Sequence, residues 1–304
     1  MALIERHPDV ADMIVEMSLA ELKVRGGVAD LVESGHLIII DDYRLPNPLE
    51  VFARLEKSLD KLGDSPIARK LKKLEAQHIL DERLPSPWSR PTFKTEIGEA
   101  VFEQLCQCSR SLYRQLHQSL AIADQELKRI FELAFPQYRP FRFIPSLRLT
   151  QTLFENLHWD NHGIDADFHQ ARVFANLDVR PRIWHVSHRI LDQARALYRE
   201  HGLGRFRGRD PNEMVAYLTR EVLGGMTAQW RDTFPRHRIA FDPGQVWLGE
   251  SRHLSHQIYY GEAAMVYMWF VNQEDMAVPS ARFNVALERL HAEMNNDPDA
   301  PRRP

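Results

Sequence analysis

The sequence Asn-Leu-His-Trp-Asp at residues 156–160 ends a strand-like run that begins at Phe143. Along a strand, residues two apart point to the same side, so His158 and Asp160 can converge on one point. His256 opens another apolar, strand-like segment much further along the chain. One His-x-Asp pair with one distant histidine is the ligand set of the facial triad, which binds Fe(II) and leaves open positions on the metal. We therefore predict a metal site at His158, Asp160 and His256.

Other histidines, and a purely structural role, compete with this prediction. His158 could equally be a buried, hydrogen-bonded core histidine, because a His-x-Asp triplet often arises by chance. We prefer His256 to His253 as the third ligand, because His256 opens an apolar strand while His253 is expected in a loop at the mouth of the site. The remaining histidines that compete as ligands are His162, His169, His185 and His188.

Length, composition and charge exclude several classes of protein. The chain has 304 residues, 44% of them hydrophobic, which is enough for a sizeable core. The formal net charge is -3, so no global basic field points to a nucleic-acid partner. No apolar run is long enough for a transmembrane helix. Residues 1–12 lack the apolar core of a signal peptide, and Cys106 and Cys108 do not face each other on a helix, so we expect a reducing cytoplasm.

Hydrophobic periodicity divides the chain into three parts. Residues 1–140 are expected to be mainly helical and packed on the core, with one short strand at Gly35–Ile40. Residues 141–278 are expected to form an antiparallel, β-rich core with a helical insert at 188–235. Residues 279–304 are expected to form a C-terminal helix and a tail. This order predicts an α+β fold whose core is a double-stranded β-helix, a jelly-roll or cupin-like arrangement decorated by helices.

The individual elements follow from the same patterns. Helices are expected at residues 10–25, 49–62, 67–78, 96–135, 190–201, 213–234 and 279–294. Strands are expected at 141–153, 171–177, 183–186 and 239–271, the last of them broken by Pro243-Gly244 and by Gly261. The basic cluster Arg69, Lys70, Lys72 and Lys73 is expected to be a solvated helix face, with a membrane-facing patch as the alternative.

An arginine in an apolar strand is the next informative feature. Arg172 lies in Gln-Ala-Arg-Val-Phe-Ala-Asn-Leu at residues 170–177, and a buried charge needs an anionic partner. Its planar fork suits either an internal Asp or Glu, or the distal carboxylate of 2-oxoglutarate. Arg182 and Arg148 are candidates for the same role or for holding a substrate. Trp184 is expected in the core or in the wall of a pocket.

These features together resemble the Fe(II)/2-oxoglutarate-dependent dioxygenase superfamily. Within it, residues 158–271 look like the Kdo hydroxylase family, which hydroxylates the 3-deoxy-manno-octulosonate sugar of the lipopolysaccharide inner core. The matching features are His158-x-Asp160, Arg-Val-Phe-x-Asn at 172–176, Pro-Arg-Ile-Trp at 181–184, a helical insert ending near Phe234, Pro-Gly-x-x-Trp at 243–247, the His256 strand and the early strand Gly35–Ile40. The acidic loop at 161–167 and the long N-terminal helices depart from the family's pattern.

The resemblance implies which cofactors the site would use. Fe(II) would bind to the predicted triad, with 2-oxoglutarate and O2 as co-substrates and ascorbate as a further reductant. The far carboxylate of 2-oxoglutarate would pair with Arg172. The wider cofactor-binding set would comprise Arg182, Arg148, Asn176 and Trp184.

The resemblance also implies a substrate and a place of action. The substrate would be a small molecule or a lipid-linked sugar acid, with Arg148, Arg182 and Arg252 as candidate cationic partners. A lipid-linked substrate would bring the chain into peripheral contact with the inner membrane, without a transmembrane segment. No nucleic-acid partner is expected.

Three other functions stay open on the sequence. The chain could be a 2-oxoglutarate-dependent hydroxylase of an amino acid, a peptide or a natural product. It could be a jelly-roll protein that binds a ligand without redox chemistry, with His158 and Asp160 as structural residues. A zinc hydrolase is the least favoured, because no nearby glutamate motif offers a general base.

Overall fold

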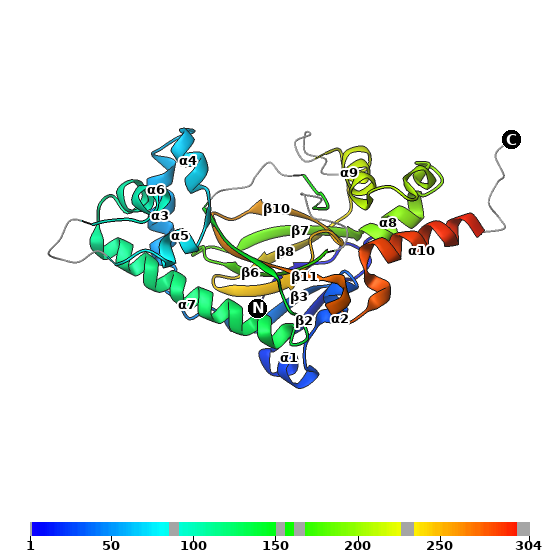
Figure 1. Cartoon of the computed structure of the whole chain (residues 1–304), viewed down its shortest axis with the longest axis horizontal. Helices are drawn as coiled ribbons and strands as arrows, with labels where there is room; N and C mark the ends of the chain where they lie inside the picture. Colours follow the sequence, from blue (N-terminus) through cyan, green and yellow to red (C-terminus); the bar gives the residue numbers. More distant parts are fainter. Residues whose placement is uncertain (1, 85–90, 150–155, 161–167, 226–233, 297–304) are drawn as a thin grey trace.

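Two β-sheets packed against each other form the centre of the molecule, and helices surround them (Figure 1). The computed structural model describes residues 2–84, 91–149, 156–160, 168–225 and 234–296. Aromatic side chains fill part of the space between the sheets. Trp184 of one sheet meets Phe174 and Trp247 of the other with ring centroids 4.9 and 5.3 Å apart. These contacts hold the two sheets face to face.

Each sheet has a mainly antiparallel order. The smaller sheet has four strands, in the order β1 (Leu3–Glu5), β8 (His237–Phe241), β7 (Arg182–Arg189) and β10 (Leu254–Tyr260). The larger has seven, in the order β2 (Ile14–Met17), β3 (Leu37–Arg44), β9 (Gln245–Gly249), β6 (Phe168–Asn176), β11 (Ala263–Asn272), β5 (Arg142–Leu149) and β4 (Lys73–Glu75). Only β2 and β3 pair in parallel among the described strands.

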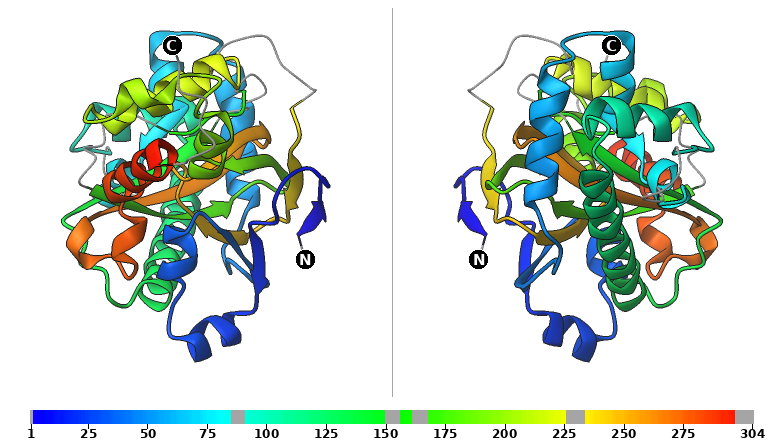
Figure 2. Two further views of the ribbon diagram at one scale, coloured as in Figure 1. Left: turned by 90° about the vertical axis from the view of Figure 1, so that its right-hand side faces the viewer. Right: turned by 90° about the vertical axis from the view of Figure 1, so that its left-hand side faces the viewer.

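The helices gather at the two ends of the sheets and along the outer face of the larger one (Figures 1 and 2). One end carries α3 (Glu50–Asp60), α4 (Pro66–Leu71), α5 (Gln77–Leu80) and α6 (Glu96–Ala100). The other end carries α8 (Ile190–Leu197), α9 (Pro211–Glu221) and α10 (Phe283–Asn296). The long α7 (Arg110–Ala134) runs under the sheet, while the short α1 (Leu19–Arg25) and α2 (Ala29–Glu33) lie beside β2 and β3.

Strand alternation decides which side chains of the larger sheet face the smaller one. In β6, Ala171 and Val173 point outward into the core beneath α7. On β11, Trp269 also points outward and stacks on Phe131 of α7, with centroids 4.0 Å apart. The alternate residue Arg172 therefore faces inward, as successive side chains of a strand point to opposite faces. The period of the strand puts an arginine between the sheets.

Most predicted elements of the β-rich part and of the C-terminal part are confirmed. The run 239–271 splits into β8, β9, β10 and β11, with breaks at Pro243-Gly244 and Gly261 as expected and a third break at residues 250–253. The predicted helix 49–62 corresponds to α3, and 96–135 to α6 and α7 joined by a π-helical turn. Cys106 and Cys108 are free thiols. The tail expected from residue 295 lies, from residue 297 on, outside the described residues.

Two predicted helices are wrong in part, and both errors come from strand pairing. The run 10–25 contains β2, whose β-branched Ile14 and Val15 pair with β3, and α1 begins only after the capping box of Ser18. The run 67–78 is interrupted by β4, which adds to the edge of β5. Residues 1–140 are therefore not only a helical layer, because they supply strands to both sheets. Throughout the described part of the chain, no helix combines the length and the apolar character that crossing a membrane requires.

Candidate metal centre

His158, Asp160 and His256 come together between the sheets. His158 and His256 are partners in an isolated antiparallel bridge. The backbone N of His158 lies 3.1 Å from the carbonyl O of His256, and the backbone N of His256 lies 3.0 Å from the carbonyl O of His158. The backbone N–H of Asp160 donates to the carbonyl of Ser251 at 3.0 Å, which fixes the third residue beside the bridge. One ligand atom from each of the three lies within 4.8 Å of the others. The predicted triad is thus assembled, although β5 ends at Leu149 and residues 150–155 lie outside the described part.

The charge state of the triad suits a divalent metal. His158 Nδ1 lies 2.8 Å from the carbonyl of Asn156, and Nε2, 3.4 Å from Asp160 Oδ1, is the ring nitrogen that faces the triad. Burial and the neighbouring His158 lower the pKa of His256 to about 3, so this ring is neutral at neutral pH. Burial alone would raise the pKa of Asp160, but Arg172 and a hydrogen bond with His158 hold that pKa well below its usual range. Imidazole nitrogens and one carboxylate are a fitting set for Fe(II).

The triad opens into a cavity of about 470 Å³ between the sheets. Its apolar walls include Phe174, Trp184 and Met268. Its cationic lining residues are Lys73, Arg142, Arg148, Arg172 and Arg182. Among the described residues that line the cavity, Asp160 is the single carboxylate. Such an excess of positive charge favours an anionic occupant.

Arg172 lies in the cavity wall, and its guanidinium forms an ion pair with a carboxylate of the protein itself. Its Nη1 lies 2.5 Å from Asp160 Oδ2 and 2.7 Å from Ser251 Oγ. Its Nε and Nη2 both donate to Gln170 Oε1, at 2.9 and 2.5 Å. Of the two partners expected from the sequence, the internal carboxylate is therefore the one observed.

Arg182 and Arg148 lie near the turn between β10 and β11. Arg148 is paired across the sheet with Ala264 and with Lys73. Arg182 is buried against Gly261, where a Cβ would lie 2.6 Å from its Cγ. Because such a contact is too close for any side chain, the glycine makes the room that Arg182 occupies. Arg182, Arg148 and Lys73 thus share one end of the cavity.

Two further residues of the predicted cofactor set have different positions. Trp184 forms the wall next to the triad, and its ring stacks on His256 with centroids 5.4 Å apart. Asn176 is not among the described residues that line the cavity, and its cofactor role stays a prediction. Its amide donates to the carbonyls of Phe241 and Asp242 and thereby braces the turn after β8.

The competing histidines that the structure describes lie outside the triad. His253 was predicted at the mouth of the site. It is buried instead, with Nδ1 2.9 Å from the carbonyl of Glu33. The carboxylate of Glu250 lies 3.5 Å from His253 and 2.8 Å from His169, and these two rings hold its pKa at about 2 against the effect of burial. His185 pairs with Gln257 and His188 with Ser187. The remaining candidate, His162, lies outside the described residues.

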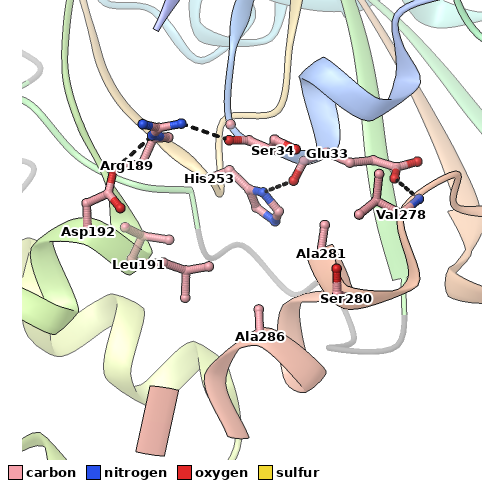
Figure 3. Close-up of a pocket in the computed structure, with 12 residues that line it drawn as sticks. Glu33, Ser34, Arg189, Leu191, Asp192, His253, Val278, Ser280, Ala281 and Ala286 are labelled. Atoms are coloured by element: carbon pink, nitrogen blue, oxygen red, sulfur yellow. Dashed lines mark hydrogen bonds and ion pairs between the residues drawn. The ribbon is translucent and has the colours of Figure 1, made fainter. Parts of the chain in front are cut away.

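A second cavity, of about 280 Å³, lies behind His253 between α2, α8 and α10 (Figure 3). The charged groups in its lining already have partners. Arg189 pairs with Asp192 at 2.9 Å, and Glu33 accepts from the backbone N–H of Val278 at 2.7 Å. With these groups satisfied, the cavity offers no convergent donors for an ion, and we assign it no chemistry.

A group of carboxylates lies where α3 meets the core, away from the triad. Glu56, Asp178 and Glu262 place one oxygen each within 4.8 Å of one another. Arg180 forms an ion pair with Glu262, and its Nε lies 3.4 Å from Asp178. Burial, with the neighbouring carboxylates, raises the pKa of Glu56 to about 9. A protonated Glu56 and a charged Arg180 reduce the repulsion here, so we assign the group a structural role.

We expect Glu56→Gln to raise the melting temperature at pH 8 and to leave it nearly unchanged at pH 4.5. The pKa of Glu56 rises from 4.5 to about 9 on folding, so the contribution of its protonated form is complete below pH 4.5 and is lost as the pH rises toward 9. Glutamine takes no part in this proton exchange. Each kcal/mol gained should add about 2–4 °C in thermal unfolding. Equal shifts at both pH values would contradict the assignment.

Comparison with known proteins supports the fold. No protein-family model and no curated protein sequence matches the chain. The solved structures that match include crystal structures of the Kdo hydroxylase KdoO, a non-heme Fe(II) α-ketoglutarate-dependent dioxygenase. The cobalt(II) complex has a TM-score of 0.60 at 13% identity and covers 96% of this chain and 100% of its own.

Two further KdoO structures match equally well. The complex with succinate and Fe(III) has a TM-score of 0.59 at 14% identity, over 96% of this chain and 100% of that one. The apo structure has a TM-score of 0.59 at 15% identity, over 94% and 97%. At these identities the likeness shows the fold. The resemblance noted in the sequence is thus confirmed as a structural match along nearly the whole chain, and the α+β class with two sheets is confirmed with it.

Proposed function

We propose that this chain is a Fe(II)/2-oxoglutarate-dependent dioxygenase with a double-stranded β-helix core, which hydroxylates a C–H bond of an anionic substrate. The observation that carries the proposal is the buried triad of His158, Asp160 and His256, with ligand atoms within 4.8 Å of one another, at the wall of a cationic cavity. The same fold in KdoO supports it. A binding protein without redox chemistry would have no need to bury two imidazoles against one carboxylate.

The residues of the triad would bind iron through His158 Nε2, Asp160 Oδ1 and a ring nitrogen of His256. When bound, Fe(II) with 2-oxoglutarate supplies the activation of O2 that hydroxylation requires. The chain's own contribution is to present His256 and Asp160 already deprotonated and to exclude water with walls such as Trp184 and Phe174.

Arg182 is our candidate for the distal carboxylate of 2-oxoglutarate. Arg172, which the sequence favoured, already has its donors directed at Asp160, Gln170 and Ser251. Arg182 is buried at the end of the cavity beside Gly261. Along β10 that end lies about 15 Å from His256, at roughly 3.3 Å per residue. A five-carbon dicarboxylate and one arginine side chain together span this length.

The substrate would approach the opposite end, where Arg142 and Gln170 line the cavity. We propose a sugar acid such as Kdo, free or lipid-linked, because KdoO is a Kdo hydroxylase and the cavity favours anions. The exposed Arg69 and Lys70 of α4 lie close to Lys73, at the co-substrate end of the cavity, so they do not supply the membrane contact that a lipid-linked substrate at the opposite end would need. An anionic amino acid or peptide is the second candidate, since its carboxylates would meet the same cations.

An anaerobic titration with Fe(II) and 2-oxoglutarate tests the proposal. We expect the weak visible charge-transfer band that a 2-oxoglutarate chelate of Fe(II) gives, and its loss in Asp160→Ala. Aerobic release of succinate with Kdo-bearing acceptors, compared with a panel of amino acids, then distinguishes the two substrate classes. A folded wild-type protein with no band at any concentration of iron would leave the binding role as the better account.

A further inference from the structure

The donors of Arg172 are directed at three neighbours within the protein. Nη1 points at Asp160 and Ser251, while Nε and Nη2 share the side-chain oxygen of Gln170. Its backbone sits in the middle of β6, paired on both sides, with Gly249 of β9 and with Met268 of β11. A guanidinium held this way has little freedom to turn toward a ligand in the cavity.

The two oxygens of Asp160 face different partners as a result. Oδ2 lies 2.5 Å from Arg172 Nη1, whereas Oδ1 lies 3.4 Å from His158 Nε2. The backbone N–H of the same residue is tied to the carbonyl of Ser251, whose side chain also accepts from Arg172. Asp160 is therefore held at its backbone N–H and at Oδ2, and Oδ1 is the oxygen that lies beside His158.

We infer that Arg172 is a positioning residue, which holds Asp160 as a ligand through one oxygen, and that it is not the arginine that binds 2-oxoglutarate. The inference rests on the proposed function, because it concerns how that metal site is prepared. Gln170 and Ser251 complete the support by anchoring the guanidinium. Partners of this kind orient metal ligands, and their loss typically reduces metal affinity by about 10- to 100-fold.

The direction in which metal affinity changes on removal of Arg172 is informative, because the loss of the positive charge and the loss of orientation act in opposite directions. A guanidinium next to a divalent cation repels it, so removing the charge should strengthen metal binding if charge were all that mattered. Weaker metal binding after the removal of Arg172 would therefore point to the lost orientation of Asp160.

Co(II) is a suitable probe, because its visible spectrum reports the coordination of the metal without any turnover. We expect Arg172→Met to bind Co(II) about 10- to 100-fold more weakly than wild type in the absence of 2-oxoglutarate, with an altered spectrum. Arg172→Lys keeps the charge but not the planar fork, so it should also bind more weakly. At saturating Co(II), the affinity of Arg172→Met for 2-oxoglutarate should stay close to that of wild type.

Further variants keep the test valid if Arg172→Met does not fold. Gln170→Ala and Ser251→Ala each remove one acceptor of the guanidinium and should weaken Co(II) binding in the same direction, by less. Arg195→Met, at an exposed ion pair on α8, controls for the loss of one positive charge. Co(II) binding in Arg172→Met that equals or exceeds wild type overturns the inference, as does a selective loss of 2-oxoglutarate binding. A wild-type protein that binds neither Co(II) nor Fe(II) overturns the proposed function itself, a result distinct from both.

Discussion

Alanine in place of His256 should remove Fe(II) binding and, with it, succinate formation from 2-oxoglutarate. His256 is one of only three protein ligands in the proposed site, and it is buried with its backbone bonded to that of His158. If each protein ligand contributes about 3–4 kcal/mol, its removal weakens metal binding by about 100- to 1,000-fold. Titration with Fe(II) in the absence of O2, followed by calorimetry or by the spectrum of the 2-oxoglutarate chelate, measures this loss.

His253→Ala is the matched control for the loss of a buried histidine. His253 lies three positions before His256, but it faces Glu33 and Glu250 instead of the triad. We expect this variant to lose thermal stability, because Glu250 and the carbonyl of Glu33 each lose a neighbouring imidazole, and to bind Fe(II) as wild type does. The opposite pattern, with metal binding lost in His253→Ala and kept in His256→Ala, would show that the third ligand has been misassigned.

Arg182→Met should raise the dissociation constant for 2-oxoglutarate about 100-fold while the affinity for metal stays unchanged. Losing one partner of a buried charge pair costs about 2–5 kcal/mol, and 100-fold corresponds to about 2.7 kcal/mol. Methionine keeps much of the volume beside Gly261, so the cavity should keep its shape. The measurement is a titration of the metal-loaded variant with 2-oxoglutarate.

Arg142→Met removes one positive charge from the opposite end of the same cavity. If Arg182 binds the co-substrate, Arg142→Met should change the dissociation constant for 2-oxoglutarate only slightly and should raise the KM of the anionic substrate instead. A 100-fold loss of 2-oxoglutarate binding in Arg142→Met, with none in Arg182→Met, would reverse the orientation that we propose for the co-substrate.

Local sequence patterns were sufficient for much of the fold. The breaks at Pro243-Gly244 and Gly261 divide the C-terminal strands correctly, because turn residues act on their own neighbours. The prediction failed at residues 10–25 and 67–78, where β2 and β4 interrupt helical patterns. Both are short strands whose conformation depends on β3 and β5, partners that lie elsewhere in the sequence. Tertiary pairing outweighs local propensity in such segments.

The sequence by itself determined the donor types of the site and the faces on which they lie. His158, Asp160 and His256 could be named because the two-residue period of extended chain and the ligand chemistry of Fe(II) are local properties. Only the tertiary structure decided which partner each of the other polar side chains contacts. It directs Arg172 to Asp160, buries Arg182 at the β10–β11 turn and removes Asn176 from the cavity. A buried charge takes whichever partner the sheet register brings within reach, and that register is set by pairings between distant parts of the chain.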